Sequence, residues 1–102
     1  MVDHYLAILV PEESGGWTVL FPDLPGCATH GATVQEAQLM AAEAADLHLA
    51  AIRRSGTETP AARTLEAVQT DAAWLQGRGI DWSKVVISLI KPDRLAEAYQ
   101  KA

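Results

Sequence analysis

The chain has 102 residues, of which 49% are apolar, and this is enough for one domain with one hydrophobic core. The formal net charge of −5 argues against a primary nucleic-acid binder, because phosphates repel an acidic surface. The charge suits a basic partner, although mild acidity is also explained by solubility alone. No segment reaches the roughly 18 consecutive apolar residues of a membrane span, and the first residues lack the pattern of a secretory signal. The single cysteine cannot form an internal disulfide, so we expect a cytoplasmic protein.

The first third of the chain predicts a β-hairpin and a short third strand. His4 to Val10 is apolar at odd and even positions alike, which is typical of a strand covered on both faces, by a helix and by a second subunit. A glycine turn joins it to Trp17 to Phe21, where apolar and other side chains alternate. Pro25 and Gly26 suit a type II turn, and Cys27 to His30 follows as the third strand.

A capping box then predicts a long helix. Thr33 is the expected N-cap with Glu36 three residues later, and the helix should run to about Arg54, before Gly56. Helical periodicity predicts that the face toward the sheet consists of Val34, Ala37, Met40, Ala41, Ala44, Ala45, Leu47, Ala51 and Ile52. The other side should present an exposed acidic stripe of Glu36, Glu43 and Asp46.

The rest of the chain predicts a linker over residues 57–63, a helix from Thr64 to about Leu75, a strand from Lys84 to Ile90 and a final helix opened by Pro92. We therefore expect an α+β fold of order β-β-β-α-β, in which an antiparallel three-stranded sheet carries one long helix and a C-terminal strand is added. The chain should form a single domain over residues 1–102, with its core in residues 4–56 and a C-terminal helix–strand–helix region in residues 64–102.

Reactive residues are not grouped in the sequence. His48 falls within the apolar helix face and is expected to be buried, and Cys27 has no CxxC partner. A metal-dependent nuclease needs several converging carboxylates, whereas the predicted strand interiors contain none. A hydrolase would lose metal-dependent RNA cleavage on mutation of Asp23 or Glu36. We expect no such activity, and hence no catalytic residue, metal site or cofactor.

In the order of its motifs, the chain resembles the HicB antitoxin family. The matching stretches are residues 5–8, 15–19, 21–27 and 31–37, followed by Thr64 to Val68, and they cover roughly residues 4 to 90. The most specific of them is a shaped turn made of Phe21, Pro22, Asp23, Leu24, Pro25, Gly26 and Cys27.

This resemblance implies a partial RNase H-like fold without catalytic carboxylates. It also implies a role as an antitoxin, which binds a HicA-type toxin, a small basic mRNA interferase, and neutralises it sterically. Many family members dimerise or assemble further, and many have a C-terminal DNA-binding module. Here residues 92–102 are too few for a ribbon-helix-helix or helix-turn-helix module, so we expect no direct DNA binding.

Exposure and charge suggest the partner-binding residues Asp23, Glu36, Glu43 and Asp46, while the residues of the turn motif look structural. We expect a homodimer or higher homo-oligomer, because the first strand is apolar on both faces and Val85 to Leu89 would otherwise leave an apolar edge. The alternative is a stand-alone oligomeric HicB-like domain without a toxin partner, which could hold a small ligand between the hairpin and Cys27 to His30.

Overall fold

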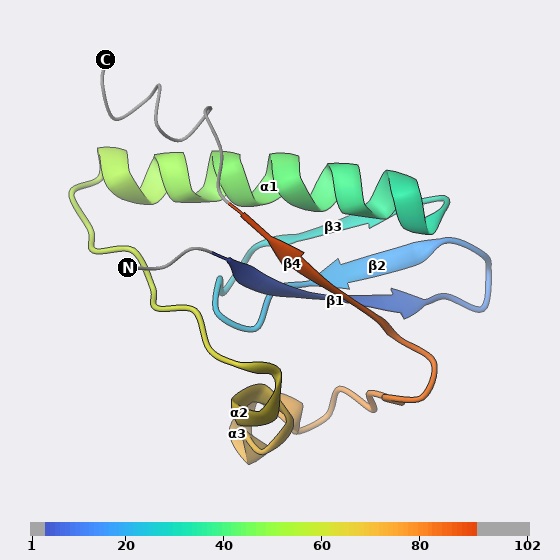
Figure 1. The fold of residues 1–102 in the computed structure, drawn as a ribbon. Helices are drawn as coiled ribbons and strands as arrows, with labels where there is room; N and C mark the ends of the chain where they lie inside the picture. The colour runs from blue at the N-terminus through green and yellow to red at the C-terminus, as the bar shows by residue number, and fades with distance from the viewer. Residues whose placement is uncertain (1–3, 92–102) are drawn as a thin grey trace.

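A computed structural model describes residues 4–91 as an α+β domain with helices on both sides of one sheet (Figure 1). Its elements are β1 (Tyr5–Pro11), β2 (Trp17–Leu20), β3 (Ala28–Gly31), α1 (Val34–Arg54), α2 (Leu65–Gln69), α3 (Ala72–Leu75) and β4 (Val86–Ile90). The strands form one antiparallel sheet in the order β3-β2-β1-β4. The helix α1 lies across one face, and α2 and α3 lie on the other side of the sheet. The expected α+β class is confirmed, with the C-terminal strand added beside β1 as the fourth strand.

The central strand β1 is buried on both faces, as its sequence predicts. Tyr5, Ala7 and Leu9 pack in the core under α1. Leu6 and Ile8 point the other way and pack with Val68, Trp74, Trp82 and other apolar residues that follow the linker. The second face is therefore covered by the chain itself, and a second subunit is not needed to bury it.

The helix α1 begins and ends where predicted, but it is rotated from the predicted orientation. Its N-cap Thr33 accepts a hydrogen bond from the Glu36 N–H, and the Glu36 carboxylate accepts one from the Ala32 N–H at 2.9 Å. The residues turned to the sheet form one row at every fourth position, Ala37, Ala41, Ala45 and Leu49. Met40 and Leu47, predicted to be buried, are 37% and 47% exposed. Small alanine side chains let the helix backbone approach the sheet closely along this row, and this sets the rotation.

The helix predicted from Thr64 to Leu75 is two short helices. The Thr64 hydroxyl caps α2 by accepting from Ala67 N–H, and the Asp71 carboxylate caps α3 by accepting from Trp74 N–H. A side chain that caps a helix accepts a hydrogen bond from an N–H group of a new first turn. One helix therefore ends before Asp71 and a second one begins after it. The strand β4 begins two residues later than predicted, because Lys84 N–H is bonded to the Asp81 carbonyl in a turn. The helix expected from Pro92 lies outside the described residues.

Candidate partner-binding site

The predicted partner residue Asp23 is not available on the surface. It is 7% exposed, and its two carboxylate oxygens accept hydrogen bonds from the backbone N–H and the Nε–H of Arg63, at 2.7 and 2.6 Å. Arg63 also donates from Nη1 to Asp71 at 2.8 Å. This bond, together with the one from Trp74 N–H, lowers the pKa of Asp71. The Asp23–Arg63–Asp71 network ties the turn motif to the linker and to α3, so the exposure expected for Asp23 is wrong.

Two of the three acids predicted on the helix are exposed. Glu36 and Glu43 lie on the outside of α1, whereas Asp46 is only 4% exposed. Asp46 lies one turn before Ala50, which is 1% exposed, so this flank of the helix is buried. The acidic stripe expected at three positions is therefore reduced to two.

Large apolar side chains accompany these two acids on the exposed side of α1. Two of them, Met40 and Leu47, were predicted to face the sheet. Glu36, Met40, Glu43 and Leu47 follow one another at spacings of three and four residues, which places them on one side of a helix. Leu39 lies beside them and is 73% exposed. We call these five residues the outer stripe. Exposed apolar side chains gathered on one surface are typical of a protein interface. The row of Ala37, Ala41 and Ala45 was the feature of the sequence that could have predicted this exposure. When this row packs on the sheet, the leucines and the methionine on the opposite side of the helix face solvent.

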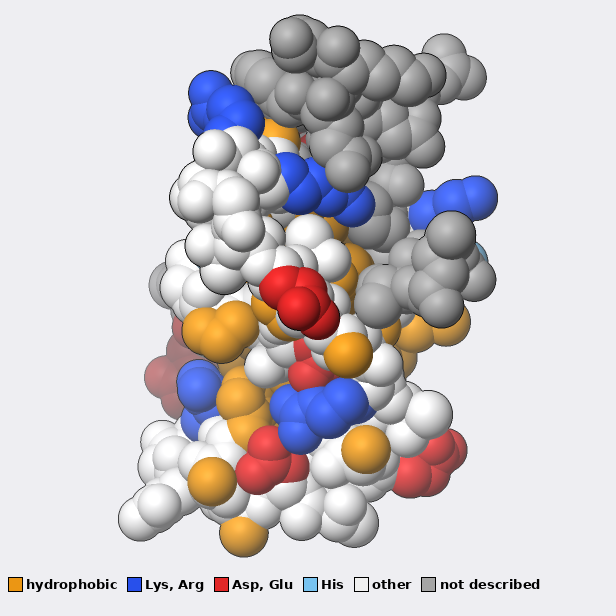
Figure 2. All heavy atoms as spheres, turned by 90° about the vertical axis from the view of Figure 1, so that its left-hand side faces the viewer, with side chains coloured by type: hydrophobic (Ala, Val, Ile, Leu, Met, Phe, Trp, Pro, Cys, Tyr) orange, Lys and Arg blue, Asp and Glu red, His pale blue; other side chains and the backbone are white. Residues whose placement is uncertain are grey.

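The charges on the face drawn in Figure 2 are mixed. The face drawn in Figure 2 has acidic and basic side chains interspersed with apolar ones, and neither sign is gathered there. The outer stripe differs in that its two exposed charged side chains are both acidic.

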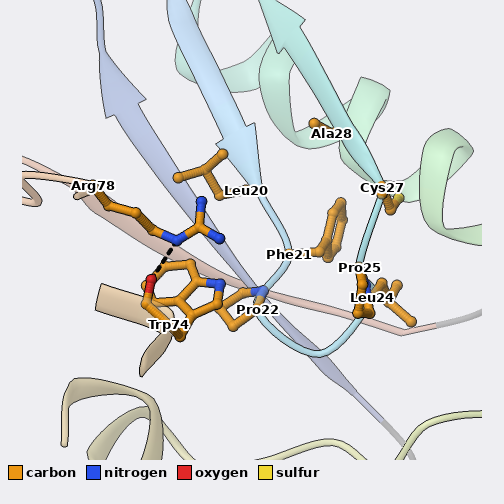
Figure 3. A pocket seen from close by; sticks show the side chains of 10 residues that line it. Leu20, Phe21, Pro22, Leu24, Pro25, Cys27, Ala28, Trp74 and Arg78 are labelled. Carbon is orange, nitrogen blue, oxygen red and sulfur yellow. Dashed lines mark hydrogen bonds between the residues drawn. The ribbon is translucent and has the colours of Figure 1, made fainter. Parts of the chain in front are cut away.

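A hollow of about 240 Å³ lies between the turn motif, the sheet and α3 (Figure 3). It is lined by Leu20, Phe21, Pro22, Leu24, Pro25, Gly26, Cys27, Ala28, Trp74 and Arg78. The expected pocket near the hairpin and Cys27 to His30 is thus present in part, since His30 does not line it. Trp74 and Arg78 were missed because they lie about fifty residues further along the chain.

Cys27, the one cysteine of the chain, is free and buried. Burial raises the pKa of Cys27 to about 11, so its side chain is a neutral thiol at neutral pH. His48, which was predicted to be buried, is half-buried. Within residues 4–91 no three His, Cys, Asp or Glu side chains are close enough to hold a metal ion. No helix in that range is both long and apolar enough to cross a membrane.

The comparisons with known proteins agree with this fold. The chain resembles a toxin–antitoxin complex from Streptococcus pneumoniae with a TM-score of 0.75 and 23% identity, covering 96% of this chain and 73% of that one. It resembles the Burkholderia pseudomallei antitoxin HicB with a TM-score of 0.68 and 19% identity, over 91% and 65% of the two chains. A HicA3 and HicB3 toxin–antitoxin complex matches with a TM-score of 0.62 and 22% identity, over 89% and 99%.

Residues 5–101 match the family described as HicB_like antitoxin of bacterial toxin–antitoxin systems, and the chain belongs to this family. It is also 34% identical over 59 residues to an uncharacterized 14.9 kDa protein of Haemophilus phage HP1. That match covers 58% of this chain and 44% of the phage protein.

Proposed function

We propose that this protein is a cytoplasmic antitoxin that binds a small basic HicA-type mRNA interferase and blocks its RNA-binding surface, without catalysing a reaction itself. Its family membership supports the antitoxin class, and two of the structures that share its fold are toxin–antitoxin complexes.

The outer stripe is the observation on which the proposed binding face depends. Leu39, Met40 and Leu47 expose apolar surface that a bound partner would remove from water. The burial of apolar surface is the main favourable contribution to the free energy of association. Glu36 and Glu43 add negative potential, which steers a basic partner to the same surface. Asp23 and Asp46, which were predicted to bind the partner, are not part of the proposed face because both are buried.

Two substitutions in the outer stripe test this face. Glu43→Lys reverses an exposed charge and Leu39→Ser removes an exposed apolar side chain, and each should weaken binding by at least about tenfold. The affinity is to be measured by calorimetry with the small basic protein encoded by the neighbouring reading frame. The charge variant should also reduce the salt dependence of the association rate.

Glu13→Lys is the matched control, since Glu13 is an exposed acid in the turn between β1 and β2 and is not part of the outer stripe. It should bind like the wild type. Equal affinities for Glu43→Lys and Glu13→Lys would exclude the outer stripe as the binding face. Failure of the wild-type pair to associate at micromolar concentration would exclude the antitoxin function.

We also propose that two copies pair through β4. This strand is at the edge of the sheet, and its residues Ile87 and Leu89, which are on the same face as Leu6 and Ile8, are 36% and 64% exposed. An edge strand with apolar side chains is prone to pair with another strand. The same edge, together with the hollow, supports the alternative of an oligomeric binding domain that has no toxin partner.

Sedimentation at tens of micromolar should show a dimer or a larger oligomer for the wild type. Leu89→Lys places a charge on the proposed contact and should shift the protein toward monomer, with Leu39→Ser on α1 as the control that leaves the oligomer unchanged. A wild type that sediments only as a monomer would contradict pairing through β4.

A further inference from the structure

One cationic side chain faces the hollow beside the turn motif without an acidic partner. Arg78 lies over the Trp74 ring, 4.5 Å from its centroid, and donates from Nε to the Trp74 carbonyl oxygen. These two contacts restrain the guanidinium of an otherwise exposed residue, so less side-chain entropy is lost on binding than for an arginine without such contacts. Figure 3 shows its two terminal nitrogens on the side of Leu20 and Phe21, and within residues 4–91 no carboxylate pairs with Arg78.

The other side chains around the hollow are apolar. Leu20 and Ala28 come from β2 and β3, and Phe21, Pro22, Leu24, Pro25 and Cys27 come from the turn motif. A ligand that fits must therefore bring an apolar group to these side chains and an anionic group to Arg78. The volume of about 240 Å³ is below the range of roughly 300–1,000 Å³ that is usual for ligand sites, which limits the ligand to a small one.

The walls of the hollow are held in place before any ligand binds. The Asp23–Arg63–Asp71 network connects the turn motif on one side with the N-cap of α3 on the other. Trp74 is in α3, and Arg78 follows closely after it. Binding therefore requires no rearrangement of either wall, and a preformed site retains more of its interaction energy as affinity.

We propose that this hollow binds a small organic monocarboxylate with a compact aromatic or branched apolar group, with Arg78 holding the carboxylate. A single guanidinium can pair with one carboxylate in bidentate geometry through its remaining N–H groups. A phosphate dianion would need several further donors, whereas beside Arg78 the side chains that line the hollow offer only the Trp74 indole N–H. Leu20 and Trp74 of this site belong to the apolar cluster on the side of the sheet away from α1, whereas the outer stripe is on the exposed side of α1, so the site is separate from the proposed toxin-binding face.

The proposal is tested by following the amide and indole N–H signals of the ¹⁵N-labelled protein during titration with phenylacetate. Saturable shifts are expected at the Trp74 indole and at the Cys27 and Ala28 amides. Phenylacetamide, which has the same shape but no charge, should bind at least about tenfold more weakly, because hydrogen bonds between charged groups contribute more than neutral ones.

Arg78→Gln should weaken phenylacetate binding by at least about tenfold, and Ala28→Leu should abolish it by filling the hollow. Lys91→Gln is the matched control, because it removes one positive charge from an exposed residue that does not line the hollow. Glu43→Lys should bind the probe normally, which separates this site from the toxin-binding face. Equal binding of acid and amide, or an unchanged affinity in Arg78→Gln, would overturn the proposal.

Discussion

Gly31→Ala is expected to lower the free energy of unfolding by about 3 kcal/mol or more, which would be among the largest effects of any single methyl group in this chain. Gly31 ends β3 next to the first turn of α1. A Cβ at this position would lie 2.3 Å from the Ala37 nitrogen and 2.5 Å from its Cα. Both are backbone atoms of the helix, so no side chain can move aside to make room. The helix would have to lift from the sheet, and equilibrium unfolding in denaturant measures the cost.

Gly26→Ala is the matched control for this prediction. Gly26 has φ +84°, and a Cβ there would meet nothing within 4 Å. Its replacement should cost about 1–2 kcal/mol, because only the left-handed backbone conformation is strained. If Gly31→Ala were no more destabilising than Gly26→Ala, the close approach of β3 and α1 would not be important for stability.

The features predicted well from the sequence are those that neighbouring residues determine. The capping box of Thr33 and Glu36 set the start of α1, and the alternation from Trp17 identified β2. The rotation of α1 could not be obtained in this way, because alanines occur on several sides of the helix and periodicity gives them little direction. The contact between Gly31 and Ala37 and the burial of Leu49 select the row that faces the sheet, and both depend on the folded arrangement.

The candidate site was harder to predict for the same reason. Asp23 is the one charged residue of the turn motif and therefore looked exposed, but its partner Arg63 is 40 residues away in the sequence. Trp74 and Arg78 likewise reach the turn motif only through the tertiary fold. Glu36 and Glu43 were placed correctly on the surface, because the outer side of a helix follows from its period once one face is buried.

The second large effect is expected for Asp23→Ala, which should lower the free energy of unfolding by about 2–3 kcal/mol. The substitution removes both acceptors from Arg63, including the acceptor of its backbone N–H. The Arg63 side chain is 35% exposed, so water can solvate part of the released charge, and this keeps the loss below that of a fully buried ion pair. Glu58→Ala removes an exposed acid from the same linker and should change stability by no more than about 0.5 kcal/mol.

A double-mutant cycle shows whether the loss comes from this contact. Arg63→Ala should also destabilise the protein, and the double variant should be less destabilised than the sum of the two single variants by about 1–2 kcal/mol. Amide hydrogen exchange should become faster in α2 and α3 in all three variants, because the network connects the turn motif to the start of α3 and so holds the cover over Leu6 and Ile8. Additive losses, with exchange in α2 and α3 unchanged, would mean that Asp23 stabilises only its own turn, and that the second face of β1 is held by apolar packing alone.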